Sequence, residues 1–213
     1  MLDTPKTMRP NRTGPKRTRI EDLRRAELIA AAHRVFMVHG LTGLTTARIC
    51  AEAGMSPGIL AYYFNGKEDV LFAMVRLNNR LLMEDVVTRL NAARTRWERL
   101  LAIVEGNFPE PVYTPTVANA WLSVVAASAT TPRYAQLQRL FYRRLRSNLA
   151  SVFAGTLPPD RTESLAQVIS GLIDGLWLQK AAQQAPGRNA AVALILDTVT
   201  ALLTKDERLR LQS

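Results

Sequence analysis

The sequence predicts an all-α protein of about nine helices. Three observations predict this class: apolar residues recur with a helical period almost everywhere from Ile20 onward, no stretch alternates with the period of a strand, and breaks rich in proline and glycine separate the helical stretches. The 213 residues allow one domain or two small ones. Hydrophobic residues make up 47% and charged residues 22%, a globular composition that excludes wholesale disorder.

A basic arm opens the chain. Residues 1–19 contain six Lys or Arg residues, three prolines and one acidic residue, and they show no apolar periodicity. This composition predicts a disordered arm, which is either a solvated tail or a segment that follows DNA phosphate. From Ile20 to Gly40, apolar residues on one face predict a first helix, and Gly40 is a suitable C-terminal cap.

Two short helices and one long helix are predicted next. Thr45 or Thr46 is a suitable N-cap for a second helix, which ends at the tight turn around Gly54. Ser56 is a suitable N-cap for a third short helix, and the proline after it fits the first helical turn. The pattern then predicts a long helix from Lys67 to about Leu90.

Five amphipathic stretches follow the long helix. Their apolar stripes begin at Trp97, Val117, Leu137, Leu165 and Ile195. The last two stretches, near residues 161–184 and 189–204, carry wide apolar stripes that a monomer would leave exposed. We therefore expect a homodimer in which these two helices and their copies form a four-helix interface.

The charge balance points to a polyanionic partner. There are 28 Lys and Arg residues against 18 Asp and Glu, which gives a net charge of +10. This excess favours nucleic acid or an anionic membrane surface. No apolar run approaches the roughly 18 residues that span a bilayer, and the N-terminus lacks the apolar core of a signal peptide. We expect a cytoplasmic protein without a membrane partner.

Neither catalysis nor cofactor binding finds support in the sequence. One cysteine, Cys50, and two histidines, His33 and His39, argue against a disulfide framework and a metal site. There is no glycine-rich phosphate loop and no Ser/His/Asp set. We predict no enzyme, no cofactor and no metal. A non-specific nucleic-acid packaging protein would explain the net charge, but not the long apolar helices that carry tryptophans.

Residues 45–64 predict a helix-turn-helix, because two short helices flank a three-residue turn that contains glycine. In this arrangement the second helix lies in the major groove. The side chains expected to hold the two helices together are Ile49, Ala53, Ile59, Leu60 and Phe64. Tyr62 and Tyr63 cannot both be buried easily on so short a helix, and their hydroxyls suit phosphate. Thr45 and Thr46 also suit phosphate, because free N–H groups point out of a helix N-terminus.

A longer run around this motif carries a family pattern. It comprises Gly40-Leu41, Thr45-Thr46, Ile49-Cys50-Ala51-Glu52-Ala53-Gly54-Met55-Ser56-Pro57-Gly58-Ile59-Leu60-Ala61-Tyr62-Tyr63-Phe64 and Lys67-Glu68-Asp69-Val70-Leu71. The run resembles the DNA-binding domain of TetR/AcrR-type regulators. The resemblance implies a dimer with a helix-turn-helix domain, residues 20–66, and a ligand-binding and dimerisation domain, residues 67–213. The positions that it places near a palindromic operator are Thr46, Ser56, Pro57, Gly58, Ala61, Tyr62, Tyr63 and Lys67, and the predicted set also includes Thr45 and Arg48.

Four motifs in the second half carry a further resemblance. They are residues 103–108 (IVEGNF), 120–122 (AWL), 143–149 (RRLRSNL) and 172–178 (LIDGLWL). These motifs resemble the BetI-type repressors, which control choline-to-glycine-betaine genes and are relieved by choline. The sequence departs from that pattern at Val124-Val125, where the pattern has Phe-Trp. The resemblance implies a repressor released from its operator by choline or a similar quaternary ammonium compound.

The chemistry of such a ligand selects candidate contacts. A quaternary ammonium has no N–H to donate, so aromatic faces and a carboxylate recognise it. The candidate aromatic faces are Trp97, Phe108, Tyr113, Trp121, Tyr134, Phe141 and Trp177, with Trp121 and Trp177 the preferred pair. The candidate charges are Glu105 and Asp174, and Asn107 is a candidate polar contact.

Each of these side chains also has an interpretation without a ligand. The aromatic residues are compatible with ordinary places in the core. Asp174 lies between Gly171 and Gly175, so its helix is also compatible with a dimer seam in which Asp174 forms a hydrogen bond. The alternative effectors are a lipophilic compound or a polyamine, which would need hydrogen-bond acceptors around its amines. The long helix from Lys67 joins both domains and is the expected coupler.

Overall fold

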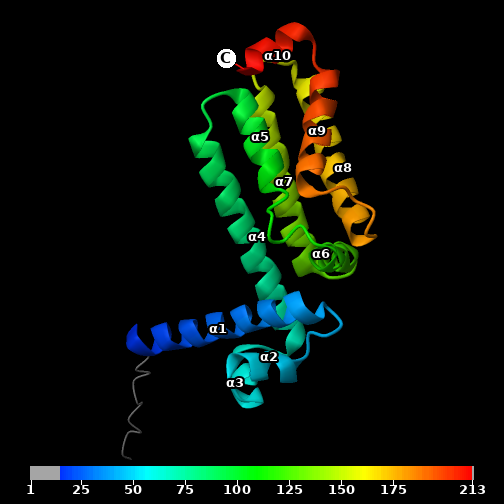
Figure 1. The fold of residues 1–213 in the computed structure, drawn as a ribbon. Helices are drawn as coiled ribbons and strands as arrows, with labels where there is room; N and C mark the ends of the chain where they lie inside the picture. Colours follow the sequence, from blue (N-terminus) through cyan, green and yellow to red (C-terminus); the bar gives the residue numbers. More distant parts are fainter. Residues whose placement is uncertain (1–14, 213) are drawn as a thin grey trace, which may run out of the picture.

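The computed structural model describes residues 15–212, and in this range it contains ten α-helices and no strand (Figure 1). The predicted all-α class is therefore confirmed. The helices are α1 (Pro15–His39), α2 (Thr46–Ala53), α3 (Pro57–Tyr63), α4 (Lys67–Ala92), α5 (Arg96–Gly106), α6 (Pro115–Ser128), α7 (Pro132–Phe153), α8 (Pro159–Ala181), α9 (Arg188–Leu202) and α10 (Lys205–Gln212).

Two boundaries differ from the expectation. Helix α1 begins at Pro15, so the prediction of disorder is wrong for residues 15–19; residues 1–14 of the expected arm lie outside the described range. Proline fits the first helical turn, and the Lys and Arg residues after it are good helix formers, so the helix extends into the basic segment. Helix α10 was not expected because it is mostly charged. Its Leu211 is nevertheless buried in the core of the C-terminal helices, the second core described below.

Capping residues mark the ends of the two short N-terminal helices, α2 and α3. The Thr45 side chain accepts a hydrogen bond from the Arg48 backbone N–H at 3.3 Å, and the Ser56 side chain accepts one from the Ile59 N–H at 3.4 Å. Between them, Gly54 has φ 63°, a left-handed conformation that favours glycine and ends α2. Both short helices thus begin and end on local signals.

Two cores lie at different levels of the molecule. The N-terminal core is built by α1, α2, α3 and the start of α4, and its buried side chains include Leu28, Phe36, Leu44, Ile49, Leu60, Phe64, Val70 and Met74. The second core lies within the bundle of α4, α5, α7, α8 and α9, which run along the long axis in Figure 1. Helix α6 lies across the end of this bundle, next to α1. No helix in the described range is long and apolar enough to cross a membrane.

Helices α4 and α6 connect the two cores. On α4, Val70 and Met74 are buried in the N-terminal core, whereas Val86 and Leu90 are buried in the second core. Helix α6 also packs against the N-terminal core, through side chains that include Val117. A displacement of either helix in one core therefore changes contacts in the other.

Candidate functional site

The side chains predicted to contact DNA gather at the end of the molecule that carries α2 and α3 (Figure 1). Eight of the ten are exposed: Thr45, Arg48, Ser56, Pro57, Gly58, Ala61, Tyr62 and Lys67. Thr46 and Tyr63 are half-buried. The exposed N-terminus of α3 has the form that a recognition helix needs, with small residues ahead of the tyrosines.

The two tyrosines of α3 have different environments. Tyr62 is 67% exposed, and its hydroxyl donates to Glu21 Oε1 at 3.4 Å. Tyr63 packs against the N-terminal core, with its ring edge-on to that of Tyr62 at 4.9 Å between centroids. Ile59 was expected to pack between α2 and α3, but it is exposed because its position falls on the solvent face of α3. Its neighbour Leu60 is buried instead.

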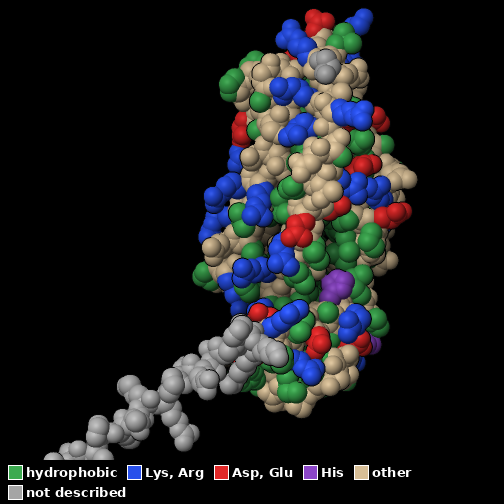
Figure 2. All heavy atoms as spheres, turned by 90° about the vertical axis from the view of Figure 1, so that its left-hand side faces the viewer, with side chains coloured by type: hydrophobic (Ala, Val, Ile, Leu, Met, Phe, Trp, Pro, Cys, Tyr) green, Lys and Arg blue, Asp and Glu red, His purple; other side chains and the backbone are tan. Residues whose placement is uncertain are grey.

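Positive charge extends beyond this end of the molecule. Figure 2 shows Lys and Arg side chains along the whole face that carries α4, with Asp and Glu side chains between them. The net charge alone therefore does not mark the DNA-binding surface. The exposed side chains of Arg48 and Lys67 form no ion pair within the described residues, and Arg48 donates one hydrogen bond to the Gly43 carbonyl at 3.0 Å. Both side chains can therefore offer positive charge to phosphate.

A cavity of about 420 Å³ lies where the bundle meets α6 and α1. Its walls come from α1, α4, α6, α7, α8 and the segment after α5, and they are mostly apolar. Five predicted ligand contacts line it: Asn107, Trp121, Phe141, Asp174 and Trp177. This volume is in the usual range for small-molecule sites.

Asp174 carries a charge into this cavity without a cationic partner. Its Oδ2 accepts a hydrogen bond from the Tyr142 hydroxyl at 2.9 Å, and it forms no ion pair in the described part of the chain. Burial raises the pKa of the Asp174 carboxyl, and the hydrogen bond from Tyr142 opposes this effect. Burial and the neighbouring carboxylate also raise the pKa of the Tyr142 hydroxyl, so this phenol stays protonated as a donor.

Asp174 and the two glycines near it lie in different surroundings. Asp174 lines the cavity, whereas a Cβ added at Gly171 or Gly175 would meet nothing within 4 Å. The two glycines thus border open space, while Asp174 is part of the cavity wall. The structure therefore places Asp174 where the ligand interpretation needs it.

An aromatic cluster fixes one wall of the cavity. The rings of Trp121 and Trp177 lie 6.5 Å apart at 44°. Behind Trp177, Phe108 stacks at 6.2 Å and Tyr113 packs edge-on at 5.1 Å. The Trp177 indole N–H donates to the Asn107 carbonyl at 3.1 Å, which fixes the ring orientation.

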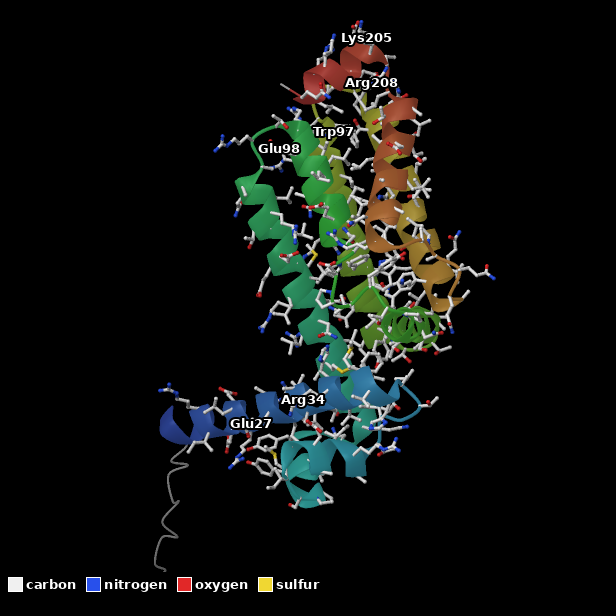
Figure 3. The ribbon with its side chains drawn as sticks, in the orientation of Figure 1. Glu27, Arg34, Trp97, Glu98, Lys205 and Arg208 are labelled. Carbon is white, nitrogen blue, oxygen red and sulfur yellow. The ribbon has the colours of Figure 1, made fainter. Side chains whose placement is uncertain are left out.

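Several predicted ligand contacts do not line the cavity. Phe108 and Tyr113 are buried behind Trp177, and Tyr134 is buried against Phe72. Trp97 lies near the end of the bundle that carries α10 (Figure 3). The Glu105 carboxylate pairs with Arg89 at 3.3 Å. These five predicted residues therefore do not line the cavity. The helical period identifies the inward face of a helix but not what lies opposite that face.

Sequence reasoning also missed part of the wall. Helix α4 contributes many lining residues, among them Asn78, Asn79 and Asp85. Two adjacent asparagines between the apolar positions of a long helix, flanked by Arg76 and Arg80, were the available signal. Asp85 differs from Asp174 because its Oδ2 lies 2.8 Å from Arg89 Nε. Within residues 15–212, no group of three or more His, Cys, Asp or Glu residues could hold a metal ion.

Comparison with known proteins gives two family matches. Residues 28–74 match the bacterial regulatory proteins of the tetR family, and residues 96–204 match the C-terminal domain described as a BetI-type transcriptional repressor. The HTH-type transcriptional regulator BetI of Rhizobium meliloti is 34% identical over 185 residues, which cover 86% of this chain and 91% of the relative. The BetI regulator of Cronobacter sakazakii is 37% identical over 169 residues, which cover 78% and 84%.

Solved structures show the same fold. A transcriptional regulator from Saccharomonospora viridis, solved in complex with choline, has a TM-score of 0.74 to this chain at 24% identity. The match covers 84% of this chain and 96% of that one. The relatives are transcriptional regulators rather than enzymes, as the sequence predicts.

Proposed function

We propose that this protein, which belongs to the TetR family and carries a BetI-type C-terminal domain, is a cytoplasmic homodimer. Choline or a similar quaternary ammonium compound releases it from its operator. The family makes the protein a DNA-binding transcriptional repressor. The identity of the effector and the dimeric state go beyond what family membership shows.

The observation that carries the effector is the unpaired Asp174 carboxylate in an aromatic-walled, apolar cavity. A quaternary ammonium needs no hydrogen-bond acceptor and gains from aromatic faces together with a negative charge. Trp121, Phe141 and Trp177 supply the faces. A polyamine carries several charged amines, whereas Asp174 is the one carboxylate in this wall without an ion pair, since the other, Asp85, contacts Arg89.

The decisive experiment titrates choline against the protein–operator complex. We expect choline to dissociate the complex and to change the tryptophan fluorescence, because Trp121 and Trp177 line the cavity. By linkage, operator DNA lowers the affinity for choline by the same factor by which choline lowers the affinity for DNA. If millimolar choline leaves both the complex and the fluorescence unchanged, the choline proposal fails while the repressor remains.

Exposed apolar side chains support the dimer. Helices α8 and α9 pack side by side at the edge of the bundle away from α4 (Figure 1). Their exposed aliphatic side chains are Val168, Leu178, Leu194 and Leu202. The open space over Gly171 and Gly175 gives a partner helix room to approach closely. We therefore propose a four-helix interface of α8, α9 and their copies.

Ligand binding reaches the DNA-binding helices through the cavity walls. His33 and Phe36 of α1 line the cavity together with α4. A ligand that favours a different packing of α1 against α4 changes the spacing of the two α3 helices in the dimer. Only a ligand that binds one of these arrangements better can shift the equilibrium between them.

Tyr62→Phe is expected to weaken operator binding by about 1 kcal/mol, or roughly fivefold, through loss of one phosphate hydrogen bond. Because Tyr62 is 67% exposed, we expect the thermal midpoint of unfolding to stay unchanged. Fluorescence anisotropy with operator DNA measures the affinity. Binding equal to the unaltered protein would place the hydroxyl away from phosphate.

We expect the affinity for choline to decrease as the pH is lowered. A bound cation stabilises the ionised Asp174, whereas burial raises the pKa of this carboxyl in the free protein. Protonation therefore competes with binding as the pH falls through the raised pKa, and the loss levels off near that expected for the neutral Asp174→Asn side chain. The charge of choline is permanent, so the ligand adds no titration. Fluorescence titrations from about pH 7.5 to about pH 5 test this, and Asp174→Asn should remove the dependence.

A further inference from the structure

We propose that the preferred effector is an elongated monocation, with a quaternary ammonium head at Asp174 and an apolar tail that extends along α4 toward α1. This inference rests on the proposed function and specifies the shape of its ligand. The cavity lining is continuous from Leu71 to Asp85 of α4. The fourteen helical steps from Leu71 to Asp85 correspond to about 21 Å, a length that a small head group alone does not fill.

The two ends of the cavity can be located from contacts. Trp177 donates its indole N–H to the carbonyl of Asn107, and Asn107 follows Gly106 directly. A Cβ at Gly106 would lie 2.6 Å from Val86 Cγ2, so α5 ends against α4 at the level of Val86. Trp177, and Asp174 one turn before it on α8, therefore lie nearer to Asp85 than Leu71 does, although Trp177 also contacts Trp121 of α6. Leu71 lies at the opposite end, beside α1.

The ends differ in chemistry. The two acidic side chains that line the cavity, Asp85 and Asp174, both belong to the first end. Asp85 is 43% exposed and contacts Arg89, which it shares with Glu105, whereas Asp174 has no ion pair in the described range; Asp174 is therefore the carboxylate that gains more from a ligand cation. One charged position therefore favours one positive charge.

The α1 end is mostly apolar, and its polar side chains, His33 and Gln138, are not carboxylates. Its lining side chains include His33, Phe36, Leu71, Met74, Val75 and Val117. No carboxylate lines this end, which disfavours a second cationic group there. Burial of hydrocarbon against these side chains would stabilise the complex in proportion to the apolar area removed from water. A methylene tail matches this lining, and it also brings the ligand against α1.

The test is a chain-length series of alkyltrimethylammonium ions, used below their micelle concentrations, with tetramethylammonium as the head alone. We expect the affinity for the full-length protein to rise about fourfold per methylene until the cavity is filled, and then to level off. Tryptophan fluorescence reports binding, and release of operator DNA follows the same order. An alcohol of matched chain length, which lacks the cation, should bind much more weakly.

Two variants at one tail position sharpen the test. Val75→Phe fills part of the space proposed for the alkyl tail. It should lower the affinity for long-chain ions, and this loss should be at least tenfold greater than the loss for tetramethylammonium. Val75→Ala enlarges this space and should shift the plateau to longer chains, so one variant remains informative if the other fails to fold. Binding of tetramethylammonium with no dependence on chain length overturns the inference and leaves the proposed function in place. If no quaternary ammonium binds, the proposed function itself fails, and equal binding of the alcohol would identify a neutral lipophilic effector instead.

Discussion

Asp174→Asn is expected to lower the affinity for choline or an alkyltrimethylammonium ion by about 30-fold, or roughly 2 kcal/mol. The amide keeps the size of the side chain and can still accept the hydrogen bond from Tyr142. It removes only the negative charge. The expected loss lies at the lower limit for a buried charge pair, because Asp174 is only half-buried.

Asp85→Asn is the matched comparison. Asp85 lines the same cavity, but its charge is offset by Arg89 at 2.8 Å. We expect this variant to change the affinity by less than about threefold. Both variants should bind operator DNA normally without ligand and should resist release in proportion to their lost ligand affinity. Equal losses at the two positions would contradict the assignment of the head group to Asp174.

Leu194→Asp is expected to break the dimer. Leu194 is 48% exposed on α9 and lies in the proposed interface. Two-fold symmetry places two copies of each substitution in one interface, and an unpaired charge buried there costs several kcal/mol. Light scattering should then give a mass near 23.7 kDa at micromolar concentration, instead of twice this value. Operator affinity should fall strongly, because each half-site is then bound by a separate molecule.

Val87→Asp is the control for this substitution. Val87 is also 48% exposed, but it lies on α4, away from α8 and α9. It should leave the dimer and its operator binding intact. A dimeric Leu194→Asp protein, or a monomeric Val87→Asp protein, would place the interface elsewhere.

Features with local causes were predictable from the chain. Thr45 and Ser56 cap helices with their own side chains, and Gly54 reverses the chain because its left-handed conformation has no steric cost there. Each signal acts within a few residues, so a single sequence contains it. Helix α10 has a charged sequence without an apolar stripe, so its pattern does not predict a helix. The basic composition of residues 15–19 favours disorder, yet α1 begins at Pro15.

The helical class, the helix-turn-helix and the side-chain chemistry of the second domain follow from the amino-acid sequence. Which of those side chains lie together depends on the packing of the helices. Trp97 and Trp177 lie on equally apolar helical stripes, yet Trp177 lines the cavity and Trp97 lies near α10. The sequence around Asp174 is compatible with a dimer seam or with a ligand cavity. In the structure, Asp174 accepts a hydrogen bond from Tyr142 and lines the cavity. The physical reason is that helical periodicity records which face of a helix is buried, whereas a cavity is the space left between five helices remote in sequence.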